Sequence, residues 1–164
     1  MKRFIGLFVL GVLLNAPVAY AKGVDEAVTV RMEAYQIVLK NKVEKRVIAK
    51  EAKPGDLLEY VAIYHNNTDH AISNLKGTMP IPEGMILIVD SPRPRHVLAS
   101  LNGKTFAAMP LKRRVKQADG SLKEVLVPLS EYRFLRWNMG VLQGEKSKNI
   151  SARMQVTPLE QSAK

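Results

Sequence analysis

The clearest pattern in the chain is an alternation of apolar and polar positions between residues 57 and 66. Leu58, Tyr60, Ala62 and Tyr64 fall on one side of an extended strand there. Pro54-Gly55 precedes this run, and these two residue types supply the fixed φ and the positive φ of a type II turn. A polar cluster at 66–69 ends the run. We therefore predict a β-strand with one buried face at the centre of an all-β domain.

Shorter patterns of the same kind recur along the rest of the chain. Residues 27–33 read as a first strand, and its apolar phase slips near residues 34–35, which predicts a bulge or a strand that switches sheets. Two hairpins are predicted, one around Asn102-Gly103 with a type I′ turn and one around Asp119-Gly120. Further strands are predicted over 71–79, 85–89, 132–139 and 150–156. Many short strands without a helical period predict an antiparallel two-sheet sandwich.

The N-terminus has the pattern of a secretory signal peptide. Lys2 and Arg3 precede an apolar run over residues 4–14, and Ala19-Tyr20-Ala21 supplies small residues at a cleavage site. The alternative, an uncleaved membrane anchor, is disfavoured because a bilayer span needs about 20 apolar residues. No later segment is apolar enough to span a membrane. We predict cleavage after residue 21 and a periplasmic or secreted protein.

Composition places the rest of the chain among ordinary globular domains. The 164 residues are 46% hydrophobic and 24% charged, which suits one domain with a full core. The chain contains no cysteine, so disulfides and a cysteine-linked lipid anchor are excluded. We expect an N-terminal strand region at 22–46, the sandwich at 47–156 and a polar tail at 157–164.

A set of motifs in a fixed order resembles a bacterial conserved-repeat domain of unknown function. The set is Pro54-Gly55-Asp56, Tyr60, Tyr64, Asn66, Pro80-Ile81-Pro82-Glu83-Gly84-Met85, Ser91, residues 102–106, Arg136-Trp137, Leu142 and Gly144-Glu145. The resemblance covers roughly residues 47–156. It implies an immunoglobulin-like β-sandwich of exported and cell-surface proteins, and it supplies no catalytic residues. This chain departs from the family in having a single copy and no anchoring motif.

Basic residues concentrate in the loop-and-hairpin half of the chain. The formal net charge is +10, and the concentrated cations are Arg93, Arg95, Lys104, Lys112, Arg113, Arg114, Lys116 and Lys123. A positive face would attract anionic partners such as lipid phosphates, wall polymers or acidic proteins. The alternative is a solvated strand edge that discourages aggregation. Few aromatic residues accompany these charges, so a nucleic-acid platform is not predicted.

The second face of the central strand is unusually apolar for a surface. Leu57, Val61 and Ile63 lie there beside Glu59 and His65. Either the N-terminal residues of the exported chain cover this face, which we favour, or it contacts another subunit or partner. The oligomeric state is left open by the sequence.

Catalytic and metal-binding motifs are sparse. His65, Asp69 and His70 carry groups that bind metals, but Asn and Asp in this cluster are also typical of a tight turn. No nucleophile elbow, phosphate loop or metalloprotease helix is present. We therefore expect no metal, no cofactor and no enzymatic activity. The predicted function is an exported module that binds or scaffolds a protein or anionic component of the cell envelope; the alternative is a periplasmic carrier of a metal or small ligand.

Overall fold

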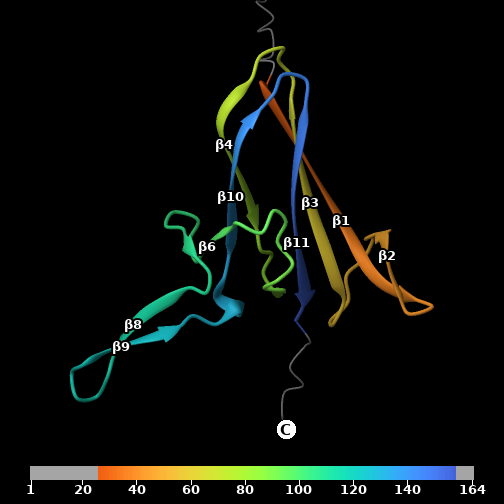
Figure 1. Ribbon diagram of the computed structural model, residues 1–164. Coiled ribbons are helices and arrows are strands. Elements are labelled where there is room, and N and C mark those ends of the chain that lie inside the picture. Colours follow the sequence, from red (N-terminus) through yellow and green to blue (C-terminus); the bar gives the residue numbers. More distant parts are fainter. Residues whose placement is uncertain (1–25, 158–164) are drawn as a thin grey trace, which may run out of the picture.

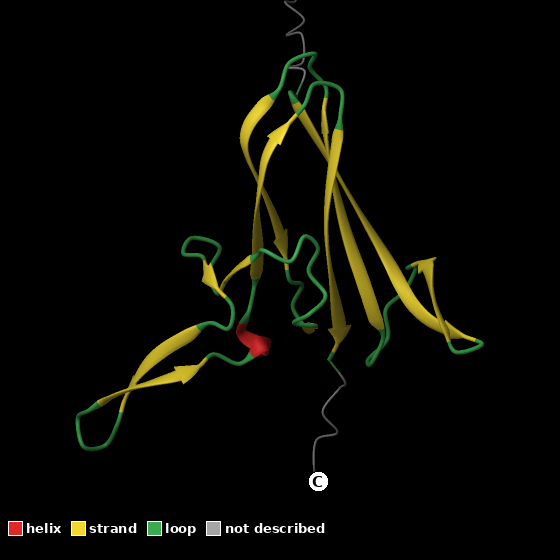
Figure 2. Cartoon of the chain, in the orientation of Figure 1, coloured by secondary structure: helices red, strands yellow, loops and turns green. Residues whose placement is uncertain are grey.

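A computed structural model describes residues 26–157, and these residues form two packed antiparallel sheets and a separate hairpin (Figures 1 and 2). The predicted signal peptide and all but the first residue of the predicted tail lie outside the described residues. No helix of the described part is long and apolar enough to cross a bilayer.

The larger sheet, sheet A, has five strands. Its order across the sheet is β2 (Val43–Ile48), β1 (Val28–Lys40), β3 (Leu57–Asn66), β11 (Ser147–Val156) and β5 (Met85–Leu87). The central strand predicted from the alternation is β3, and it lies in the middle of this sheet. Strand β1 pairs with β3 from Val28 to Gln36, so the N-terminal region belongs to the sheet.

The second sheet, sheet B, has four strands and packs on one face of sheet A. Its order is β4 (Ile72–Pro80), β10 (Phe134–Leu142), β6 (Leu98–Ser100) and β7 (Ala107–Ala108). The remaining pair, β8 (Lys112–Lys116) and β9 (Leu122–Leu126), forms a hairpin of its own. A short 3₁₀ helix, η1 (Leu129–Glu131), leads from β9 towards β10.

The core lies between sheets A and B and confirms the predicted all-β sandwich. Leu58, Ala62 and Tyr64 of β3 are buried, as the period of two requires for one face of a strand. On β11 the buried apolar residues are Ile150, Ala152 and Met154, as expected from the same alternation. Trp137 is 1% exposed and its Nε1 donates a hydrogen bond to the Pro94 carbonyl at 2.8 Å, so the single tryptophan is a core residue.

Two predictions of local structure are wrong. Strand β1 keeps an uninterrupted register with β3 and β2 and stays in sheet A, so there is neither a bulge at residues 34–35 nor a switch between sheets. The apolar phase changes because β1 runs beyond β3 and its last residues pair only with β2; Leu39 there is 77% exposed. Strand β6 pairs with β7, so a six-residue loop replaces the two-residue type I′ turn. In that loop only Gly103 has positive φ, and the Asn102 side chain instead accepts hydrogen bonds from the Lys104 and Thr105 amides.

Candidate functional site

The hairpin β8–β9 is the most prominent surface feature that carries predicted site residues. Its turn contains Gly120 at φ 85°, and Ser121 donates to the Asp119 carboxylate from its amide and its hydroxyl at 2.9 and 2.7 Å. These short-range bonds explain why Asp-Gly closes the hairpin where the sequence predicts it. Figure 1 shows both strands extending away from sheets A and B. The hairpin therefore presents its side chains to the surroundings on two faces.

Three buried residues hold the base of the hairpin to the core. Leu111 and Val127 flank its two strands and are 7% and 5% exposed. The Val127 amide donates to the Leu111 carbonyl at 2.9 Å, and the Leu111 amide donates to the hydroxyl of fully buried Tyr132 at 2.6 Å. The core thus fixes the base of the hairpin and leaves its strands outside.

The pairing register divides the hairpin residues between two faces. Paired residues of antiparallel strands share a face, so Lys112, Arg114 and Lys116 lie with Leu126, Glu124 and Leu122. On this face Leu122 and Leu126 are 65% and 62% exposed. The opposite face carries Arg113, Val115, Lys123 and Val125. One face therefore combines three cations with two exposed leucines.

Some of the hairpin cations are paired and others are not. Lys112 donates to Glu124 at 2.8 Å, and this hydrogen bond raises the pKa of Lys112. Arg113 pairs with Glu131 of η1 at 2.6 Å. Arg114, Lys116 and Lys123 have no carboxylate within 4 Å in the described part of the chain. These three exposed charges can contact an anionic partner without first breaking an ion pair.

The other three predicted cations lie elsewhere. Lys104 is in the loop between β6 and β7, and Arg93 and Arg95 are in the loop that follows β5. Arg93 borders a hollow on sheet A, whereas Arg95 borders a smaller one beside Val89 and Pro92. The structure therefore brings five of the eight predicted cations together on one hairpin and separates the rest.

The residues weighed as metal ligands form no cluster. His70 Nδ1 lies 2.7 Å from the Asp69 carboxylate, and this hydrogen bond lowers the pKa of Asp69. His65 instead contacts the Ser147 hydroxyl at 2.9 Å. Within residues 26–157 no group of three or more His, Cys, Asp or Glu residues is arranged to hold a metal ion. The loop after β3 is organised by Asn66, whose side chain bonds to three carbonyls and to Thr68.

The predicted apolar contact residues lie on the face of sheet A that points away from sheet B. Val61 is 7% exposed, and Leu57 and Ile63 are partly buried. The predicted cover by the N-terminal strand is wrong, because β1 pairs with the edge of β3 in the same sheet and does not lie across this face. Neighbouring side chains of β1 and β11 in the same sheet flank Val61, among them Glu33 and Ser151.

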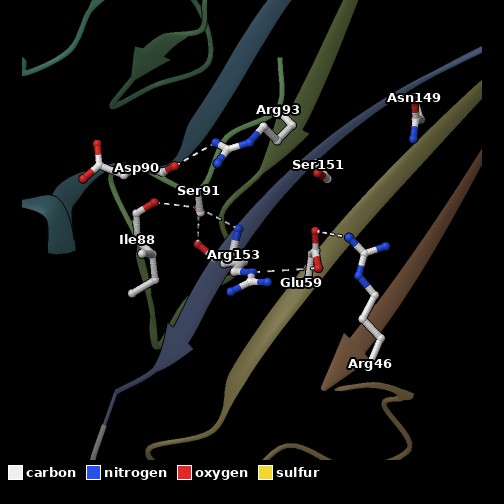
Figure 3. Close-up of a pocket in the computed structure, with 9 residues that line it drawn as sticks. All are labelled: Arg46, Glu59, Ile88, Asp90, Ser91, Arg93, Asn149, Ser151 and Arg153. Carbon is white, nitrogen blue, oxygen red and sulfur yellow. Dashed lines mark hydrogen bonds and ion pairs between the residues drawn. The ribbon is translucent and has the colours of Figure 1, made fainter. Parts of the chain in front are cut away.

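Glu59 is a buried carboxylate on this same face of sheet A. It is 5% exposed and lies between two arginines, one from the adjacent strand β11 and one from β2, which reaches it across β1 (Figure 3). Arg46 of β2 donates to Glu59 Oε1 at 2.8 Å, and Arg153 Nε of β11 lies 3.8 Å from Oε2. Arg153 also pairs with Glu44 at 2.9 Å. Because a buried charge is costly unless paired, this ion-pair network explains how a glutamate occupies the middle of the sheet.

A polar hollow of about 510 Å³ opens beside this ion-pair network. Sequence reasoning missed it, although Glu59 among apolar residues of a strand face was a signal. The register then places Arg153 opposite Glu59 and Ser151 opposite Val61. The loop after β5 completes the hollow, because Arg93 and Ser151 exchange backbone hydrogen bonds at 2.7 and 2.8 Å.

Fold and surfaces together define an antiparallel β-sandwich with an outlying basic hairpin and a polar hollow on its larger sheet. Comparisons of the chain with protein-family models, curated proteins and solved structures find no match. The resemblance to the conserved-repeat domain stays a prediction.

Proposed function

We propose that this protein is an exported, non-catalytic, immunoglobulin-like module that binds an anionic component of the cell envelope through the hairpin β8–β9. The proposal rests on one observation: the hairpin stands outside the sandwich and concentrates five cations, three of which have no ion-pair partner in the described chain. Packing does not require these cations there, since every residue from Lys112 to Glu124 is exposed. The predicted signal peptide places such a surface where lipid phosphates, wall polymers and acidic proteins are abundant.

The leucines on the hairpin add a second kind of contact. Leu122 and Leu126 lie on the face that carries Arg114 and Lys116. Charge alone gives binding that salt screens, whereas apolar contact resists salt. We expect binding to weaken with ionic strength but to retain a salt-resistant remainder.

The test compares two variants that lose the same charge at different places. Arg114→Gln, Lys116→Gln and Lys123→Gln together remove the three unpaired hairpin charges. The control, Lys40→Gln, Lys45→Gln and Lys50→Gln, removes three exposed lysines on or after the β1–β2 hairpin. Retention in isolated envelope fractions is measured over a salt series, and in-cell crosslinking with mass spectrometry identifies the partner.

We expect the hairpin variant to lose about tenfold or more in retention, because each cation at an anionic surface contributes on the order of 1 kcal/mol. The control variant should stay near the native level. Equal losses in both variants would show that only net charge matters, and they would contradict a hairpin site. Crosslinks confined to copies of the protein itself would also contradict the proposal.

A further inference from the structure

The hollow on sheet A lies where a small side chain, that of Ser151, is surrounded by longer ones. Ser151 lies between Val61 on β3 and Arg93 on the loop after β5, and Asn149 and Arg153 flank it along β11 (Figure 3). The serine side chain fills little of the space that its neighbours enclose. The volume of the hollow, about 510 Å³, is within the roughly 300–1,000 Å³ range of small-molecule sites.

Arg93 gives the hollow, which Asp90 also lines, a guanidinium that forms no ion pair with the described residues. Its Nη1 donates to the Asp90 and Pro92 carbonyls, each at 2.8 Å, which holds the side chain against its own loop. No carboxylate lies within 4 Å of this guanidinium in the described part of the chain. Its Nε and Nη2 make no hydrogen bond to the described residues. Arginine recognises a carboxylate with two such donors.

Three other polar residues of the hollow, Glu59, Ser151 and Asn149, suit hydroxyl groups. Glu59 Oε2 is buried and has no hydrogen-bond donor in the described chain, since Arg153 Nε lies 3.8 Å away. A buried acceptor without a donor is unfavourable, and a hydroxyl can supply one. The Ser151 hydroxyl and the Asn149 amide also make no side-chain hydrogen bond within residues 26–157, and both can donate and accept.

We propose that this hollow binds an acidic sugar, in which a ring with several hydroxyls carries a carboxylate. The carboxylate would bind Arg93, and the hydroxyls would bind Glu59, Ser151 and Asn149. Ile88 is the single apolar residue among those that line the hollow, so a fatty or aromatic ligand would find little to contact. A free uronic acid and a residue of an acidic polysaccharide share this chemistry. The hollow and the hairpin share no residue, so this inference is independent of the proposed function.

The test is a titration of the ¹⁵N-labelled protein followed by nuclear magnetic resonance. Sodium glucuronate is the probe, and glucose, sodium acetate and inorganic phosphate are the comparators. We expect saturable shifts at the amides of Arg93, Asn149 and Ser151 with glucuronate. Glucose lacks the anion and acetate lacks the hydroxyls. Each should therefore bind at least about tenfold more weakly than glucuronate. A short oligogalacturonate distinguishes the two sources. Binding tighter than that of glucuronate would indicate a polysaccharide, and weaker binding would indicate a free sugar.

Variants locate the binding within the hollow. Ser151→Leu fills the space, Arg93→Gln removes the charge and Asn149→Ala removes an exposed amide; each should weaken glucuronate binding, the first two by about tenfold or more. Arg95→Gln removes a neighbouring charge outside the hollow and should change nothing. If Ser151→Leu or Arg93→Gln fails to fold, Asn149→Ala still tests whether glucuronate binds in the hollow. The Asn149 side chain is exposed, so its loss should leave the fold intact.

Three results would overturn the inference. The first is the absence of saturable shifts with glucuronate. The second is acetate or phosphate binding as tightly as glucuronate, which would show an adventitious anion only. The third is glucuronate binding that none of the three variants changes.

Discussion

At the scale of single residues, Asn66 joins the loop after β3 to the turn between β10 and β11. Its Nδ2 donates to the carbonyls of His70, Leu142 and Gln143, and its Oδ1 accepts from Thr68. Asn66 is fully buried, so these bonds replace the water that its side-chain amide would otherwise bind. A Cβ at Gly144 in the adjoining turn would overlap the Asp69 backbone, which shows how closely the two segments pack.

Replacing Asn66 should therefore be costly. Asn66→Ala would remove the amide donor from the buried Leu142 carbonyl and from the part-buried carbonyls of His70 and Gln143, and we expect it to lower the free energy of unfolding by about 2–4 kcal/mol. Urea denaturation measures the change. Asn67→Ala is the matched control, because the Asn67 side chain is exposed and should cost under about 1 kcal/mol. Similar losses for both variants would contradict the role of Asn66.

Asp119 at the hairpin tip should titrate at unusually low pH. The Ser121 hydroxyl and amide donate to its carboxylate and lower the pKa of Asp119 below its ordinary value of about 3.9. A depressed folded pKa gives stability that is present above the ordinary value and is lost as pH falls through the folded pKa. Carbon-detected titration measures the Asp119 pKa, and Ser121→Ala should raise it; an unchanged pKa in that variant would refute the assignment.

At the scale of elements, the hairpin depends on a bond that neither of its own strands supplies. The Tyr132 hydroxyl accepts from the Leu111 amide, and the residue lies in the core after η1. Tyr132→Phe would leave this buried amide unpaired, and we expect a loss of about 1–3 kcal/mol and faster amide exchange at Leu111. Tyr64→Phe is the control, because its hydroxyl makes only a 3.5 Å contact with the Thr78 carbonyl. Exchange at Leu111 that stays unchanged in Tyr132→Phe would count against this anchor.

At the scale of the whole molecule, the N-terminal strand protects an edge of sheet A. Removing residues 26–46 would delete β1 and most of β2 and expose the edge of β3, with which a second chain could then pair. We expect the shortened protein to melt at a lower temperature and to associate, as measured by thermal unfolding and size-exclusion chromatography. A shortened protein that remains monomeric with unchanged stability would show that the domain begins after β1.

Much of the fold follows from the sequence because its causes are local. The alternation in β3 and β11 marks one buried face on each strand, and Asp119-Gly120 supplies the turn of the hairpin that forms. The Asn102-Gly103 prediction failed because the Asn102 side chain bonds to the next backbone amides, a competing local structure. The prediction of a bulge or sheet switch in β1 failed because the change of apolar phase has a non-local cause. The pairing of β1 with β3 ends at Gln36, and the later residues of β1 pair only with β2.

The sequence alone determined the strand pattern, the single core tryptophan and the basic character of the β8–β9 hairpin. Only the tertiary structure decided that Arg93 lies apart from the hairpin cations, and that Arg46 and Arg153 meet at Glu59. The physical reason is that a strand's own residues decide which side it buries, whereas its neighbours are decided by pairing between segments far apart in the chain. The hollow on sheet A depends on that pairing, so no local motif could have predicted it.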